Sequence, residues 1–244
     1  MAVALDLGTE YPTTTTPHSG AASFSWSHGG AASNVKGVLV YTFTLLSATD
    51  HATSVTYGGS SLSRVTGGLA TDTAGEPGVC ATWFLGASVP QGTQTVVVNR
   101  TNDSVGMYGV CITVTGGRDT EAVGPVVVEE NQGAAFDEQN VDDGSVSGTD
   151  SVRFAGVWYG GNNVPGAGAN STALQSIDPG AYNCSTVYET TAGIGSRPVG
   201  SSVGTDDCAF VALAVRETAP PASSYEEFYH RIAHRRGLAT YRRM

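Results

Sequence analysis

The chain has 244 residues and a formal net charge of −10, from 12 Lys and Arg against 22 Asp and Glu. Glycine accounts for 32 residues and charged side chains for only 14%, which argues against a helical bundle because glycine costs about 1 kcal/mol per helical position relative to alanine. The hydrophobic share of 40% excludes a disordered chain, and the acidic balance argues against nucleic acid as a partner, since nucleic acid binds Lys and Arg.

The first predicted elements are extended. Residues 1–33 are rich in Thr, Ser, Gly and Ala, and we interpret them as an N-terminal arm that leads into a first strand near residues 22–27. Residues 37–45 form an almost continuous apolar run, which is typical of a strand covered on both faces. Two short runs flank Gly58 and Gly59 and predict a hairpin, because glycine adopts the positive φ angles of tight hairpin turns.

Short apolar runs, separated by Gly, Asp and Asn clusters, continue to residue 216. They predict strands near residues 54–57, 61–66, 79–86, 95–98, 107–115, 126–129, 152–159, 186–189 and 209–216. With about ten strands and no amphipathic helical stretch between them, the sequence predicts an all-β fold, a single antiparallel and jelly-roll-like β-sandwich over residues 34–217. Two polar stretches, residues 129–150 and 160–182, are predicted as long exposed loops.

The chain changes character after this domain. Residues 218–224 form a Pro-rich linker, and residues 225–244 are predicted as a short amphipathic, basic α-helix and tail. Ser224 and Glu227 match a capping box, which marks a helix start. A free helix of about twelve residues is marginal in water, so its apolar stripe is predicted to dock on another surface.

Charge divides at the same linker. Residues 1–216 carry seven Lys and Arg against 19 Asp and Glu, a net charge of −12, whereas residues 217–244 carry five Arg against three Glu, a net charge of +2. We therefore predict that the tail contacts another copy of the chain or a larger assembly. The alternative is that the helix folds back on its own sandwich. The predicted interface residues are Tyr225, Phe228, Tyr229, Ile232, Arg231, Arg235 and Arg236.

The cysteines point to a reducing environment. No pair has C-x-x-C spacing, which argues against a zinc or redox motif, and we interpret them as buried free thiols, with a disulfide formed outside the cell as the alternative. The N-terminus lacks the features of a secretion signal and no apolar run is long enough to span a bilayer, so we expect synthesis in a cytosol. The four are Cys80, Cys111, Cys184 and Cys208.

Motifs of catalysis and cofactor binding are not predicted. Lys36 is the only lysine, which argues against a Walker loop, and neither an H-E-x-x-H motif nor a nucleophile elbow is predicted. His230 and His234 are interpreted as a solvated helix face. We therefore predict a protein without enzymatic activity, cofactor or metal. Three acidic pairs are interpreted as a solvating surface, with calcium binding as the alternative: Glu129-Glu130, Asp142-Asp143 and Asp206-Asp207.

Three consecutive stretches resemble a known module. They are residues 55–65 (VTYGGSSLSRV), 79–86 (VCATWFLG) and 89–98 (VPQGTQTVVV). Together they resemble a β-sandwich module of virion proteins of tailed bacteriophages and of bacterial surface or prophage proteins. The resemblance implies a capsid decoration or minor tail protein, made in the host cytoplasm and present in the virion in multiple copies. Its partners would be other copies of itself and other virion proteins, and it implies no catalytic residue.

Two other functions remain open at this point. One is a receptor-binding or carbohydrate-binding module of a phage tail tip or fibre, which would bind a host surface glycan through exposed aromatic side chains. The other is a hydrolase built on a sandwich scaffold, and this is the less favoured of the two. The aromatic candidates for a glycan site are Trp26, Trp158, Tyr159 and Tyr182.

Overall fold

The computed structural model describes ten stretches of the chain: residues 3–6, 17–29, 34–73, 75–130, 137–144, 151–161, 165–177, 182–189, 194–202 and 207–218. Within these stretches the protein is all-β, and the strand pairs are antiparallel, as the sequence predicts. The predicted C-terminal helix and its interface residues lie outside the described residues.

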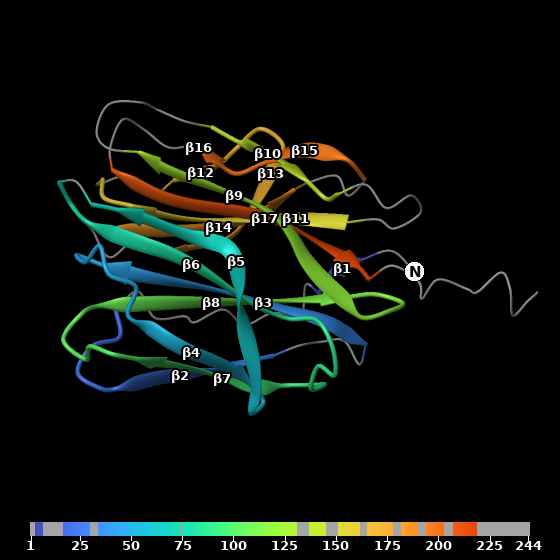
Figure 1. Cartoon of the computed structure of the whole chain (residues 1–244), viewed down its shortest axis with the longest axis horizontal. Helices are drawn as coiled ribbons and strands as arrows, with labels where there is room; N and C mark the ends of the chain where they lie inside the picture. Colours follow the sequence, from blue (N-terminus) through green and yellow to red (C-terminus); the bar gives the residue numbers. More distant parts are fainter. Residues whose placement is uncertain are drawn as a thin grey trace, which may run out of the picture.

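The larger sheet has eight strands and curls on itself (Figure 1). The curl arises in β5, which pairs with β4 through Ser60–Leu62 and with β6 further along, with a break in register between Arg64 and Leu69. One long strand therefore belongs to both halves of the sheet. The strand order is β1 (Ala4–Leu5), β8 (Met107–Thr115), β3 (Val35–Leu45), β6 (Gly78–Leu85), β5 (Ser60–Asp72), β4 (Ala52–Tyr57), β7 (Gln94–Arg100) and β2 (Ser23–His28).

A second sheet of five strands packs against the middle of the first. Its order is β13 (Ser171–Ile177), β14 (Asn183–Glu189), β11 (Ser151–Tyr159), β17 (Cys208–Glu217) and β9 (Thr120–Glu130). Two small sheets lie beyond it: β10 (Gln139–Asp142) with β15 (Ser196–Val199), and β12 (Gly166–Ala167) with β16 (Ser201–Ser202). Figure 1 shows β2, β4 and β7 at the bottom of the molecule and the small sheets at the top.

Three hydrophobic clusters separate these layers, and alternation along each strand decides which cluster a side chain joins. In β3, Val38 and Val40 face the cluster inside the curl, whereas Leu39 and Tyr41 face the cluster between the two large sheets. In β11, Trp158 joins the cluster between the sheets, while its neighbours face a third cluster beneath the small sheets. The central strands are therefore buried on both faces.

This layering confirms several sequence predictions. The apolar run at residues 37–45 is buried along its whole length. Gly58 and Gly59 connect β4 to β5 with φ angles of 55° and 82°, as the hairpin prediction requires. The strand predicted near residues 22–27 is β2 (Ser23–His28), but it is not the first, because β1 lies within the predicted N-terminal arm and pairs with β8.

Both predicted long loops are wrong in part. The acidic stretch 129–150 contains β10, which pairs with β15 and buries Val141 completely. The stretch 160–182 contains β13, which pairs with β14. Both strands lie at a sheet edge or in a two-stranded sheet, so they need few apolar side chains. Their sequences therefore lack the apolar runs by which the central strands were predicted.

The prediction of buried free thiols is confirmed. All four cysteines are buried and none forms a disulfide, and burial raises the pKa of Cys80, Cys111 and Cys184 well above the usual value. Because the thiolate is the reacting species, we expect no reaction with Ellman's reagent in the native protein and reaction of all four thiols after unfolding in guanidinium chloride. Rapid labelling of the native protein would contradict this burial.

Candidate functional site

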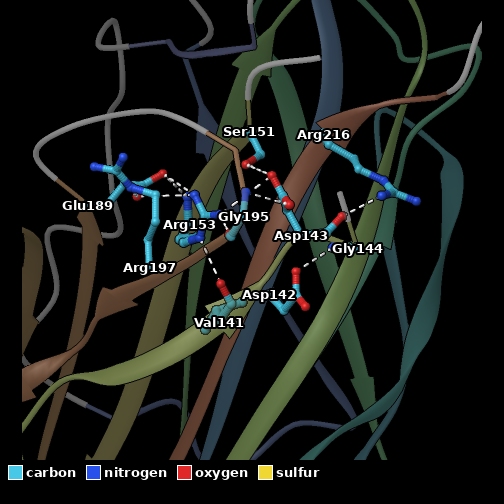
Figure 2. Close-up of polar contacts among 10 residues, drawn as sticks. All are labelled: Val141, Asp142, Asp143, Gly144, Ser151, Arg153, Glu189, Gly195, Arg197 and Arg216. Carbon is cyan, nitrogen blue, oxygen red and sulfur yellow. Dashed lines mark hydrogen bonds and ion pairs between the residues drawn. The ribbon is translucent and has the colours of Figure 1, made fainter. Parts of the chain in front are cut away.

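A buried cluster of charged residues lies on the outer face of the five-stranded sheet, beneath β10 and β15 (Figure 2). Its centre is Arg153 of β11, whose side chain is completely buried. The Arg153 guanidinium donates to Oε1 and Oε2 of Glu189 at 3.0 and 3.2 Å. Its Nε donates to the backbone oxygen of Val141 at 3.0 Å, and Nη2 donates to the backbone oxygen of Gly195.

The second carboxylate of the cluster belongs to Asp143. Its Oδ2 lies 3.5 Å from Nη2 of Arg153 and accepts the Ser151 hydroxyl at 2.7 Å. Its Oδ1 accepts the backbone N–H of Gly195 at 2.9 Å. Asp143 therefore links the end of β10 to β11 and to the residue that precedes β15. The loop predicted around this residue is thus partly an interior element.

Glu189 receives a second arginine from β15. Arg197 donates its Nε to Oε2 of Glu189 at 3.2 Å, and its side chain is one third exposed. Burial raises the pKa of Glu189, while the charges of Arg153 and Arg197 oppose this shift. Two buried carboxylates thus face two guanidinium groups, of which Arg153 is completely buried and Arg197 is one third exposed. The cluster holds together β10, β11, β14 and the residue before β15. Because Arg153 is inaccessible, the cluster does not offer a ligand site.

Glu217 forms another clamp, at the end of β17 and over the turn between β8 and β9. Its Oε1 accepts the backbone N–H groups of Gly117 and Arg118, and Oε2 accepts the Arg118 Nε at 3.1 Å. Burial acts to raise the pKa of Glu217, but these donors outweigh burial and the pKa lies below the usual value. The ionised form is therefore stabilised in the folded state.

This pKa shift gives a pH-dependent stability. A depressed folded-state pKa contributes stability above the unfolded-state pKa, and this stability is lost as the pH falls through the folded-state pKa. We expect Glu217→Gln to lower the free energy of unfolding by about 1.5 kcal/mol at pH 7 and by much less at about pH 3. Urea unfolding at both pH values measures this. Glu121→Gln, in the more exposed pair with Arg216, is the control and should change little.

A groove of about 550 Å³ runs between β5 and β9. Its apolar lining includes Val65, Phe84, Ala122, Val123 and Pro125, all of them half-buried. β9 is the edge strand of the five-stranded sheet on this side. The groove therefore lies where an apolar surface meets a strand edge. Surfaces with both features bind other polypeptide segments.

The serine–histidine pair that Ser47 and His51 form after β3 was not identified from the sequence. The Ser47 hydroxyl lies 3.1 Å from Nε2 of His51, and Nδ1 of His51 lies 3.0 Å from the Thr101 hydroxyl. The spacing of four residues within a predicted turn was the available signal. Ser47 also accepts the backbone N–H of Thr49 at 3.2 Å. The third member of this arrangement is the Thr101 hydroxyl, whereas a catalytic triad has a carboxylate in that place. The arrangement therefore serves to close the turn after β3.

The sequence reasoning also missed a match to the nucleophile-elbow pattern G-x-S-x-G at residues 200–204 (GSSVG). A nucleophile elbow connects a strand to a helix. Here the motif begins in the two-stranded pairing of β16 with β12, and the next described element is another strand, β17. Among the described residues, Ser202 thus lies in a strand pairing opposite Gly166 and not at a strand-to-helix turn.

The remaining predicted residues are distributed through the fold. Trp158 and Tyr159, two of the aromatic candidates for a glycan site, are 0% and 4% exposed. Of the acidic pairs, Asp143 and Asp207 are buried, and Asp207 accepts the backbone N–H of Glu76 at 2.9 Å. Among the described residues, no group of three or more His, Cys, Asp or Glu is arranged to hold a metal ion.

Comparison with protein-family models, with curated proteins and with solved structures found no match to the chain. Across the described stretches, no helix has the length and apolar character needed to cross a membrane.

Proposed function

We propose that this chain is a non-enzymatic structural component of a tailed-phage virion, either a capsid decoration protein or a minor tail protein. In this proposal a jelly-roll-like β-sandwich forms the body, and the N-terminal arm and C-terminal helix contact other copies and other virion proteins. The protein is made in the host cytoplasm and incorporated into the particle in multiple copies.

The observation that supports this proposal is the structural use of the residues that carry the resemblance. Gly58 and Gly59 form the hairpin turn, and Gly92, with a φ of 74°, lies in the turn before β7. Trp83 is 6% exposed, and its Nε1 donates to the Thr42 hydroxyl at 3.2 Å. Each of these residues shapes a turn or fills the core of the curled sheet. The resembling stretches thus carry architecture, as a structural module would.

The charged clusters around Arg153 and Glu217 also support a structural role, because each of them connects separate strands of the body. Arg153, Glu189 and Asp143 connect β10, β11, β14 and the segment before β15, and Glu217 ties β17 to the turn before β9. Buried ionic contacts of this kind favour one defined arrangement of strands. A body held in this way suits a protein that must present fixed surfaces to many neighbours.

Immunogold electron microscopy tests the proposal. Antibodies raised against the purified full-length chain are applied to intact phage particles prepared from the source of this sequence, with particles of an unrelated phage as control. We expect regular labelling of the capsid or of the tail. Particles that remain unlabelled, while the protein is abundant in the lysate that yielded them, would overturn the virion role.

A receptor-binding or carbohydrate-binding module of a tail tip or fibre is the alternative. Trp26 is half-buried and packs over Gly109 inside the curl, and Tyr182 is the other half-exposed candidate. Glycan-array binding by the full-length chain, abolished by Tyr182→Ala, would favour this alternative over a purely structural role.

A further inference from the structure

We propose that the groove between β5 and β9 receives the C-terminal segment, residues 225–236, of a second copy of the chain. This inference rests on the proposed function, in which the chain assembles through that segment, and it names the surface on which the segment docks.

The groove leaves apolar surface uncovered. Val65, Phe84 and Ala122 pack on the cluster between the two large sheets from one side and line the groove from the other. Val127, further along β9, is opposite Val211 of the same cluster and is 36% exposed. Large apolar side chains gathered on one face mark a contact surface more often than isolated ones do. The groove is therefore a surface that gains stability when it is covered.

The C-terminal segment matches this surface in chemistry and in length. At helical spacing its apolar side chains, Tyr225, Phe228, Tyr229 and Ile232, fall on one face. The twelve residues 225–236 would extend about 18 Å as a helix, and residues 120–125 of the groove wall extend about 17 Å as a strand. Because so short a helix is marginal alone, it requires a surface of this size.

The direction of the chain favours a neighbour's groove over the chain's own. β17 runs antiparallel to β9 and ends with Glu217 opposite Thr120, and the Thr218 N–H donates to the Asp119 oxygen at 2.9 Å. At Thr218, the last described residue, β17 has therefore run past the start of β9, beyond residues 120–125 of the groove wall. Pro220 and Pro221 follow, and consecutive prolines favour extended backbone over a reversal.

Charge supports the same pairing. The segment from residue 217 onwards carries +2 against −12 for the body, whereas the groove lining itself holds one acid and one base, Glu121 paired with Arg216 and Arg64 paired with Asp50. At helical spacing Arg231 and Arg235 flank the apolar stripe and Arg236 continues it at its C-terminal end, so these charges would approach the acidic body of the other copy. A reciprocal exchange of segments between two copies closes a symmetric dimer, which is the commonest form of assembly.

Engineered disulfides in the full-length chain test the proposal. Thr66→Cys places a thiol on the exposed groove wall of β5, and Ala233→Cys places one on the apolar face of the segment. The four native thiols are buried, so oxidation reports on the engineered pair. We expect Thr66→Cys/Ala233→Cys to double in mass on a non-reducing gel and to return to the monomer mass with dithiothreitol.

Two control pairs make the result specific. Ser25→Cys/Ala233→Cys moves the body thiol to β2, on another part of the molecule, and Thr66→Cys/His234→Cys moves the segment thiol to the opposite helix face. After the same oxidation both should migrate at the monomer mass on the non-reducing gel. Maleimide labelling of each native variant first verifies that its engineered thiols react and that the protein is folded.

Three outcomes would overturn the inference. The first is a disulfide within one chain, which would be seen as a faster-migrating monomer and by mass spectrometry of mixed isotope-labelled chains. The second is equal crosslinking of the controls. The third is the absence of any crosslink. None of them bears on the immunogold result. Particle labelling without the crosslink would leave the virion role standing with a different docking surface, whereas the crosslink without particle labelling would leave a dimer that is not a virion component.

Discussion

Replacing Arg153 with Met is expected to lower the free energy of unfolding by about 3–5 kcal/mol, because it removes one partner of a buried ion cluster and leaves the others uncompensated. Glu189 would lose both guanidinium contacts that Arg153 supplies and would retain the backbone N–H of residue 153 and the side chain of Arg197. The backbone oxygens of Val141 and Gly195 would lose their donor as well. Urea unfolding followed by tryptophan fluorescence measures the change.

Arg197→Met is the matched control for this substitution. It removes the same type of side chain from the same carboxylate, but Arg197 is one third exposed and makes one bond to Glu189, so we expect a loss of about 1 kcal/mol or less. Adding Glu189→Leu to Arg153→Met should recover part of the lost stability, because an apolar pair replaces an unpaired buried charge. Equal losses for the two arginine variants would contradict the central role of Arg153.

Replacing Gly78 with Ala is expected to lower the free energy of unfolding by about 1–3 kcal/mol or more, through overpacking. Gly78 begins β6, and a Cβ atom built there would overlap the indole ring of Trp158 from the opposing sheet. Trp158 is 0% exposed, so its ring has no free space into which it can move. The two sheets would have to separate locally, and the near-ultraviolet circular dichroism of Trp158 should change with the stability.

Gly166→Ala is the control for Gly78→Ala, since no atom lies within 4 Å of a Cβ built at Gly166. We expect its stability to stay within about 0.5 kcal/mol of the unmodified chain. Trp158→Phe, which removes part of the overlapping ring, should cost less in the Gly78→Ala background than it does alone. Simple additivity of the two changes would show that the indole ring is not what Gly78 accommodates.

Runs of apolar residues bounded by turn residues predicted the central strands well, but they did not indicate the cluster around Arg153. Residues 137–144, the part of the acidic stretch that holds Asp143, offer one apolar residue, Val141, as a strand signal, and their polar composition is typical of a loop. Arg153 and Glu189 are 36 residues apart, and Gly195 and Asp143 are 52 apart. Their contacts depend on which strands lie side by side, and hydrophobic periodicity does not carry that information.

The groove could not be predicted from the sequence either, because it too depends on which strands lie side by side. Its walls come from residues 63–66 and 120–125, which lie on strands of different sheets. Each segment alone is an ordinary half-apolar strand. The C-terminal segment was the opposite case, because its apolar spacing and its arginines are local features that the sequence displays directly.

By itself the sequence determined that the protein is all-β, where its central strands and glycine hairpin lie, and that its cysteines are buried, because these properties follow from local composition and from the two-residue period of strands. The tertiary structure alone decided that a strand such as β3 lies between two hydrophobic clusters, that Arg153 is neutralised by Asp143 and Glu189, and that β5 and β9 enclose a groove. These features are contacts between distant segments, and their energies depend on which faces the folded chain brings together.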